Sequence, residues 1–308
     1  MAKRKRTKRK AKRLSFKLGS SKRKIKIAHS PSLKSILKVL AVVCAFAAVA
    51  IGFAFLGKYV KKADTVSQSS ATLKLVNPPS WVNYQLEEKI YAAAMADGED
   101  LKPDEDTALS VQQNIETLVA WLDEVTVQTT HDSILIEGRW RKPLALVRSG
   151  LHKFYVDAEL IVLDFVPMPN LPIVKVKGLS VITKPQPGEI WRRDDLAAAV
   201  AVLIRLDRMD KLVTPDKPLL YEIDRIDVSN FNGRQNSRAS HIILYTNDNT
   251  EIIWGAEIGA WQRHLEATDK DKLARLYDYY KEYGSLNSVK YINLRDPQNN
   301  IPLPIDKY

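Results

Sequence analysis

Cysteine is nearly missing from this chain of 308 residues, which contains only Cys44. A single thiol excludes an intramolecular disulfide and any zinc site built from several cysteines. Any part of the chain that lies outside the reducing cytoplasm must therefore be held together by its hydrophobic core alone. The length is sufficient for such a core.

Acidic residues are missing from the first 38 positions, which contain sixteen Lys and Arg. The other 31 Lys and Arg stand against 36 Asp and Glu, so residues 39–308 carry a net charge of about −5. The formal net charge of +11 is therefore a property of the N-terminal tail. The tail could be an arm that binds nucleic acid. A determinant of membrane topology that rests on anionic lipid is the plainer interpretation.

Signatures of catalysis and metal binding are also missing. The sequence has no HExxH motif, no GxSxG nucleophile elbow and no GxxxxGK[ST] phosphate loop. The histidines are isolated, and His241, which opens an apolar strand, is more simply a structural residue. The pairs Asp104–Asp106 and Asp194–Asp195 precede helical patterns, where carboxylates cap helices. We therefore expect no enzyme activity, no metal and no cofactor. A hydrolase with two carboxylates stays open because the chain has many of them, but no spacing selects a pair.

Residues 39–57 form an uncharged, apolar run of 19 residues. A helix of that length would span the ~30 Å hydrocarbon layer of a bilayer, and the run lies too far from the N-terminus for a cleaved signal peptide. Sixteen basic residues precede the run and three lysines follow it closely. This asymmetry predicts a single-pass type II membrane protein with a cytoplasmic N-terminus and an extracytoplasmic C-terminal region. Small residues share one helical face, where a partner helix could pack: Ala41, Ala45, Ala48 and Gly52.

Two patterns follow a polar linker at 58–71. Up to residue 140, the apolar spacing predicts the order strand, helix, helix, strand, strand. From residue 144 onward, short strands alternate with turns, and helices are expected at about 194–208 and from Thr268, where Asp271 suggests a capping box and Gly284 a helix end. The predicted fold class is α+β: a single transmembrane helix, a small β-α-α-β-β domain, and a larger mixed, mainly antiparallel β domain with a few helices.

The order of these parts resembles the FtsQ family of bacterial cell-division proteins, called DivIB in Gram-positive organisms. Segments similar to those of the family follow one another in order along the chain: LVAWLDEVTV at 118–127, ILIEGRWRKPLALV at 134–147, KFYVDAELIVLD at 153–164, NLPIVKVKGL at 170–179 and KLARLYDYYKEYGSLNSVKYINLRDP at 272–297. The last is similar to the family's final helix and its closing Tyr-Ile-Asp-Leu-Arg strand, with Asn293 in place of Asp. Two residues are inserted around Trp140, and the opening strand lacks the usual glycine and runs into Pro78 and Pro79.

The resemblance implies an organisation and a role. The implied parts are a basic cytoplasmic tail at 1–38, a transmembrane helix at 39–57, a linker at 58–71, a POTRA-like domain at 72–143, an FtsQ-type β domain at 144–296 and a polar tail at 297–308. The implied role is that of a non-enzymatic divisome scaffold in the bacterial cytoplasmic membrane at the midcell division site. It would link early cytoplasmic division components to septal cell-wall synthesis.

The resemblance also implies partners and a binding site. The expected partners are FtsB- or DivIC-like and FtsL-like coiled-coil membrane proteins, other divisome proteins and anionic lipid, but no nucleic acid. A partner strand is expected at the exposed edge of the last strand, with the site residues Tyr291, Ile292, Asn293, Leu294 and Arg295. Side chains alternate along a strand, so we expect Ile292 and Leu294 to face the core and Tyr291 and Arg295 to be free for the partner.

Three alternatives remain open from the sequence. The last strand could merely complete its sheet, with Tyr291 covering apolar surface. The chain could be a membrane-anchored cell-wall enzyme or enzyme regulator, which a catalytic Ser, Lys or Glu in a deep pocket would favour. It could also tether nucleic acid to the membrane through its basic tail.

Overall fold

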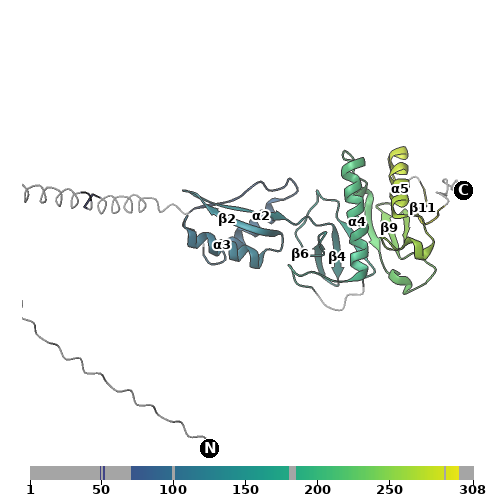
Figure 1. Ribbon diagram of the computed structural model, residues 1–308, viewed down its shortest axis with the longest axis horizontal. Coiled ribbons are helices and arrows are strands. Elements are labelled where there is room, and N and C mark those ends of the chain that lie inside the picture. The colour runs from purple at the N-terminus through teal and green to yellow at the C-terminus, as the bar shows by residue number, and fades with distance from the viewer. Residues whose placement is uncertain are drawn as a thin grey trace, which may run out of the picture. The chain divides into compact units, whose positions relative to one another are not determined.

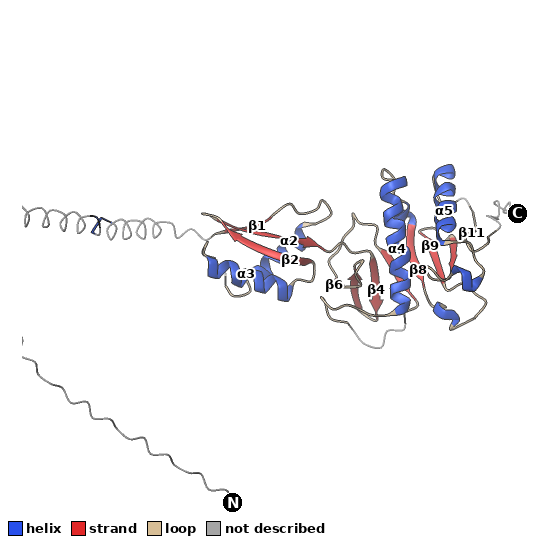
Figure 2. Ribbon diagram, viewed as in Figure 1, coloured by secondary structure: helices blue, strands red, loops and turns tan. Residues whose placement is uncertain are grey.

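The computed structural model describes residues 49, 51–52, 71–98, 101–179, 185–287 and 289–297. The chain divides into two compact units, residues 1–67 and 68–308. The described part of the second unit contains four α-helices and two β-sheets, one of three strands and one of eight (Figures 1 and 2). It is therefore a mixed α and β structure.

The smaller sheet and its two helices follow one another in the order that the sequence pattern predicts. The elements are β1 (Thr72–Leu75), α2 (Tyr84–Ala94), α3 (Glu105–Leu118), β2 (Leu122–Thr129) and β3 (Ser133–Trp140). β3 lies in the middle, parallel to β1 and antiparallel to β2. Side-chain caps begin both helices, since Asn83 Oδ1 accepts from Leu86 N at 3.0 Å and Asp104 Oδ1 accepts from Thr107 N at 2.8 Å.

The larger sheet has the strand order β11-β10-β9-β8-β7-β4-β5-β6. Its strands are β4 (Ala145–Ser149), β5 (His152–Val156), β6 (Val162–Asp164), β7 (Val174–Lys177), β8 (Ile223–Asp227), β9 (Ile242–Thr246), β10 (Glu251–Gly255) and β11 (Tyr291–Asn293). β7 pairs in parallel with both β4 and β8, and β11 pairs in parallel with β10, while the other four pairs are antiparallel. The sheet is thus more evenly mixed than the sequence pattern suggests.

Two helices, α4 (Asp194–Val213) and α5 (Asp269–Tyr283), pack on the larger sheet and lie side by side (Figure 2). The hydroxyl of Tyr277 on α5 donates to Leu206 O on α4 at 2.9 Å. As expected, Thr268 caps α5, accepting from Asp271 N at 3.1 Å, and Gly284 ends the helix in the left-handed conformation. Both helices contribute to one core with the strands beneath them.

A second core joins the small sheet to the far end of the larger one. Trp121, which precedes β2, is fully buried and donates from Nε1 to Asp164 Oδ1 on β6 at 3.1 Å. Its ring meets Tyr155 of β5 edge-on, with 5.9 Å between the ring centroids. Leu163 of β6 is buried in the same cluster. The two sheets therefore share apolar packing.

The expected transmembrane helix is not part of the fold that the structure describes. In this part of the chain, no helix is both long and apolar enough to cross a lipid bilayer. α4 has the 20 residues that a span needs, but Asp, Arg and Lys recur along it, and charges are costly in the hydrocarbon layer. With 11, 14 and 15 residues, α2, α3 and α5 are short. The predicted fold class was therefore wrong in this respect. The run at 39–57 lies outside the described residues, apart from the helical and exposed Val49, Ile51 and Gly52.

Candidate functional site

β11 forms one edge of the larger sheet, as Figure 1 shows near the C-terminal end of the described chain. Its Cα partners on β10 run from Tyr291 opposite Glu251 to Asn293 opposite Ile253. The opposite edge, β6, is already paired with a loop, because Val162 N donates to Glu189 O at 2.9 Å and Gly188 N donates to Val162 O at 2.8 Å. Of the two edges of this sheet, β11 is therefore the candidate for an incoming strand.

The side chains of the last strand alternate as the sequence predicts. Ile292 and Leu294 are both 0% exposed and belong to the core beneath α4 and α5. Tyr291 is 37% exposed, and Asn293 is partly buried. The prediction that Ile292 and Leu294 face the core is therefore confirmed. Tyr291 is the large apolar side chain that this strand presents to solvent.

The backbone of β11 has an inner and an outer side. Leu294 N donates to Ile253 O at 3.0 Å, so in a parallel ladder the even-numbered residues bond to β10 and the odd-numbered ones point outward. The outer side is occupied at Arg295, whose carbonyl oxygen accepts from Ala267 N at 2.9 Å. The outward N–H and C=O groups of Tyr291 and Asn293 are thus the short stretch of edge that another strand could join.

Arg295 is anchored rather than free, and this corrects the prediction from alternation. Its Nε donates to Glu266 Oε1 at 2.7 Å, and its Nη1 donates to Ser240 Oγ at 3.3 Å. Its backbone N donates to Asn293 Oδ1 at 3.1 Å. The chain turns after Asn293, so strand alternation no longer fixes the direction of this side chain. Arg295 holds the end of the edge strand in place.

A buried carboxylate lies at the centre of this anchor. Glu266 accepts from Lys272 Nζ at 2.6 Å and from Ala256 N at 2.9 Å, in addition to Arg295. Lys272 is 0% exposed, and its ammonium lies 5.5 Å from the centroid of the Trp254 ring. Burial by itself would raise the pKa of Glu266, but the hydrogen bonds from Lys272 and Ala256 hold this pKa below its usual value.

Gly255 makes room for this carboxylate. It ends β10 with φ +98°, and a Cβ built there would collide with the carboxylate of Glu266. The sequence offers no local signal for this cluster, because Gly255, Glu266, Lys272 and Arg295 meet only through the fold of β10, α5 and β11. Sequence analysis therefore found Arg295 but not its partners.

The pKa of Glu266 predicts part of the acid sensitivity of the fold. Because the folded-state pKa is lowered, the carboxylate stabilises the fold at pH values above its unfolded pKa, and this contribution is lost as the pH falls. We expect the free energy of unfolding to decline as the pH falls below about 5, and to decline less steeply in Glu266→Gln. Denaturant titrations at several pH values measure both slopes. Equal slopes would contradict this role for Glu266.

His241 has a structural environment, as the sequence suggests. It is buried before β9, its Nδ1 lies 3.1 Å from Glu257 Oε2, and its ring meets that of His264 with 4.6 Å between the centroids. Burial would raise the pKa of Glu257, but the contact with His241 keeps this pKa below its usual value. Among the described residues, no group of three or more His, Cys, Asp and Glu is arranged to hold a metal ion.

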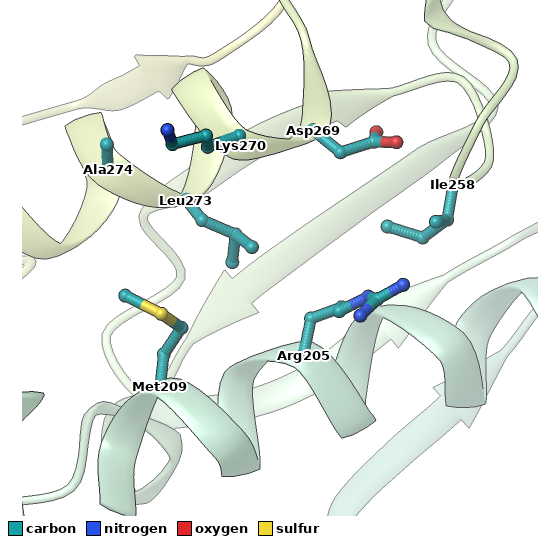
Figure 3. Close-up of a pocket in the computed structure, with 7 residues that line it drawn as sticks. All are labelled: Arg205, Met209, Ile258, Asp269, Lys270, Leu273 and Ala274. Atoms are coloured by element: carbon teal, nitrogen blue, oxygen red, sulfur yellow. The ribbon is translucent and has the colours of Figure 1, made fainter. Parts of the chain in front are cut away.

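A cavity of about 430 Å³ lies between α4 and α5 (Figure 3). Met209 of α4, Leu273 of α5 and Ile258 of the loop after β10 supply apolar walls, and Arg205 and Lys270 flank them. Asp269 Oδ2 accepts from Gly259 N at 2.7 Å. No nucleophile is held against a base among the lining residues, so the cavity is better suited to an apolar contact than to catalysis.

A smaller cavity of about 280 Å³ includes two carboxylates of α4 in its lining. Asp207 accepts from Lys142 Nζ at 2.9 Å and pairs with Lys211 Nζ at 2.6 Å. Asp210 accepts from Leu219 N, Leu220 N and the hydroxyl of Tyr277 at 2.7–3.0 Å. These contacts tie α4 to its neighbours, so both carboxylates have structural partners.

Of the four small residues predicted to pack against a partner helix, the structure describes Gly52 alone. Ala41, Ala45 and Ala48 lie outside the described residues. Gly52 is helical and exposed, and a Cβ added to it would meet nothing within 4 Å among the described residues. Their packing therefore stays a prediction from sequence.

No family model matches the sequence, and no curated protein is significantly similar to it.

Proposed function

We propose that this chain is a non-enzymatic scaffold of the bacterial division machinery, similar to the FtsQ and DivIB proteins. In this proposal it links early cytoplasmic division components to septal cell-wall synthesis at midcell. It does so by binding FtsB- or DivIC-like and FtsL-like coiled-coil proteins, alongside other divisome proteins. The sequence resemblance at 118–179 and 272–297 supports this proposal, because it follows the order of the elements along both sheets.

One observation supports β11 as the binding site. On its outer side β11 has no partner strand among the described residues, and it is held in place because Ile292 and Leu294 are buried in the core and Arg295 is tied to Glu266. An incoming strand gains backbone hydrogen bonds only if the edge is already extended, and a pre-ordered edge lowers the entropic cost of binding. Because only Tyr291 and Asn293 offer outward backbone groups, side-chain contacts must supply much of the affinity.

The location of the protein in the cell tests the proposal at the level of function. A fluorescent protein fused to the full chain, expressed in the native host, should gather at midcell before the cell constricts. Depletion of the chain should produce filaments of undivided cells. A uniform distribution together with normal division would overturn the proposed function.

Replacement of Tyr291 tests the binding site. Tyr291→Ala should weaken binding of the FtsB-like protein of the same organism by about tenfold or more, because a half-exposed tyrosine at an edge is a typical interface anchor. Binding is measured by pull-down and titration with the purified partner. The matched control is Tyr283→Ala, which removes a tyrosine of similar exposure, 49%, at the end of α5. Unchanged thermal unfolding with retained binding of Tyr291→Ala would place the site elsewhere.

A further inference from the structure

Three cations lie side by side on the face of the larger sheet opposite α4 and α5. Arg148 of β4 pairs directly with Lys153 of β5. Arg148 and Lys177 each come one residue after the parallel pair Val147–Val176, so Lys177 of β7 lies on the other side of Arg148. Both valines belong to the core under the helices, so the three cations project from the opposite face. All three are exposed.

These cations lack anionic partners within the described chain. Like charges directly opposite one another destabilise a sheet. None of the ion pairs among the described residues includes Arg148, Lys153 or Lys177. Asp227 is opposite Lys177 on β8 and offsets part of the charge at that end of the row, while its Oδ1 accepts from Ser229 N at 2.7 Å. Lys175, two residues before Lys177, has its own partner in Asp224. An anionic ligand would relieve the repulsion between Arg148 and Lys153, which lie directly opposite one another.

The turn that joins the strands of Arg148 and Lys153 carries an exposed apolar side chain. Gly150 and Leu151 form the two-residue turn between β4 and β5, and Gly150 takes a φ of +59°, which glycine adopts without strain. Leu151 is 99% exposed. Beside it, Lys153 Nζ lies 5.0 Å from the ring centroid of Phe165, which is itself 38% exposed. Exposed cations and exposed apolar side chains thus occur together at the β4–β5 hairpin.

We propose that the β4–β5 hairpin docks on the surface of an anionic lipid bilayer. Leu151 enters the boundary between headgroups and acyl chains, while Arg148, Lys153 and Lys177 contact lipid phosphates. An acidic peptide would also neutralise the cations, but it gives no reason for an apolar side chain to stand fully exposed at the tip of a turn. The proposal goes beyond the proposed function, and it holds whichever partner the β11 edge binds.

The experiment places a reporter at the hairpin tip of the full chain. In a Cys44→Ser background, Leu151→Cys carries an environment-sensitive fluorophore, and the probe is a vesicle of phosphatidylglycerol and phosphatidylcholine. We expect a blue shift of the fluorophore and quenching by brominated acyl chains. The same label at Leu212→Cys, which replaces an 81% exposed leucine of α4, should show neither change. Arg148→Glu, Lys153→Glu and Lys177→Glu combined should abolish the response at position 151.

The basic N-terminal tail makes the controls necessary, because it is expected to bring every variant to an anionic vesicle. A charge-matched control combines Arg205→Glu, Lys270→Glu and Lys281→Glu, which reverses three exposed cations of α4 and α5. It should leave the response at 151 intact. An unchanged fluorophore on phosphatidylglycerol vesicles, or equal responses of the two triple variants, would overturn the proposal. A shift of the same size with soluble poly-glutamate would also overturn it and assign the row to acidic peptides.

Discussion

Lys272→Met should lower the free energy of unfolding by about 3–5 kcal/mol. Lys272 has no exposed surface, and its ammonium is the closest charge to the buried carboxylate of Glu266. Methionine fills a similar volume, so the loss comes from leaving Glu266 with the partly exposed Arg295 as its one cationic partner among the described residues. Urea denaturation of the purified chain, followed by tryptophan fluorescence and circular dichroism, measures the change.

The control for this variant lies two residues earlier on the same helix. Lys270→Met removes an exposed ammonium near the start of α5, and we expect a change below about 0.5 kcal/mol. In the double variant Lys272→Met with Glu266→Gln, removal of both charges should recover part of the lost stability. A cost below about 1 kcal/mol for Lys272→Met would show that the pair contributes little.

Trp121→Ala should lower the free energy of unfolding by about 3–5 kcal/mol. The indole is fully buried between the two sheets, where it contacts Tyr155 and donates to Asp164. The truncation leaves a cavity and removes a hydrogen-bond donor from a carboxylate that Lys89 also contacts, at 2.5 Å. Because the lost contacts join both sheets, their unfolding should become less cooperative.

Two probes separate the loss of stability from the loss of cooperativity between the two sheets. A fluorophore on the small sheet and far-ultraviolet circular dichroism of the whole chain should follow one transition in the parent protein and diverge in Trp121→Ala. Trp121→Phe keeps most of the ring and loses the donor, so its cost should be smaller. Coincident transitions with an unchanged midpoint in Trp121→Ala would contradict a shared core.

Local signals made much of the secondary structure predictable. Asp104 before α3, and Thr268 and Gly284 at the two ends of α5, act through neighbours within four residues, so the sequence carries the whole interaction. α4 was predicted to end at about residue 208 but continues to Val213. Asp210 explains the difference: its carboxylate is satisfied by Leu219 N, Leu220 N and Tyr277, so a charge that suggests an exposed helix end is buried.

The sequence pattern does not predict β7 as a strand. Its four residues alternate Val and Lys between a proline-rich stretch and Gly178, which is a weak pattern for a strand that has neighbours on both sides. The stability of β7 comes from parallel partners on β4 and β8, the second of which lies about 50 residues away in the sequence. Such pairing leaves no trace in a short window of sequence.

The candidate site shows the same limit. Alternation along the last strand correctly places Ile292 and Leu294 in the core. It fails for Arg295, because the partner Glu266 is 29 residues away. Lys272 illustrates a second reason: lysine is almost never buried unless paired, so helical spacing alone assigns it to solvent and places Leu273 inside. In the structure, Lys272 is buried and Leu273 is only partly so.

The parallel pairing of β11 with β10 has a consequence for the order of folding. The two strands are separated by the whole of α5, so their ladder forms only after a long loop has closed and the helix has docked. The β9–β10 hairpin needs no such closure and can form earlier. During this interval β10 is itself the edge of the sheet, with the apolar Ile252 and Trp254 on one face. Pulse-labelling hydrogen exchange should therefore find the amides of β9 protected before those of Ile292 and Leu294. Until then, a newly made chain exposes an unprotected edge that another copy could join.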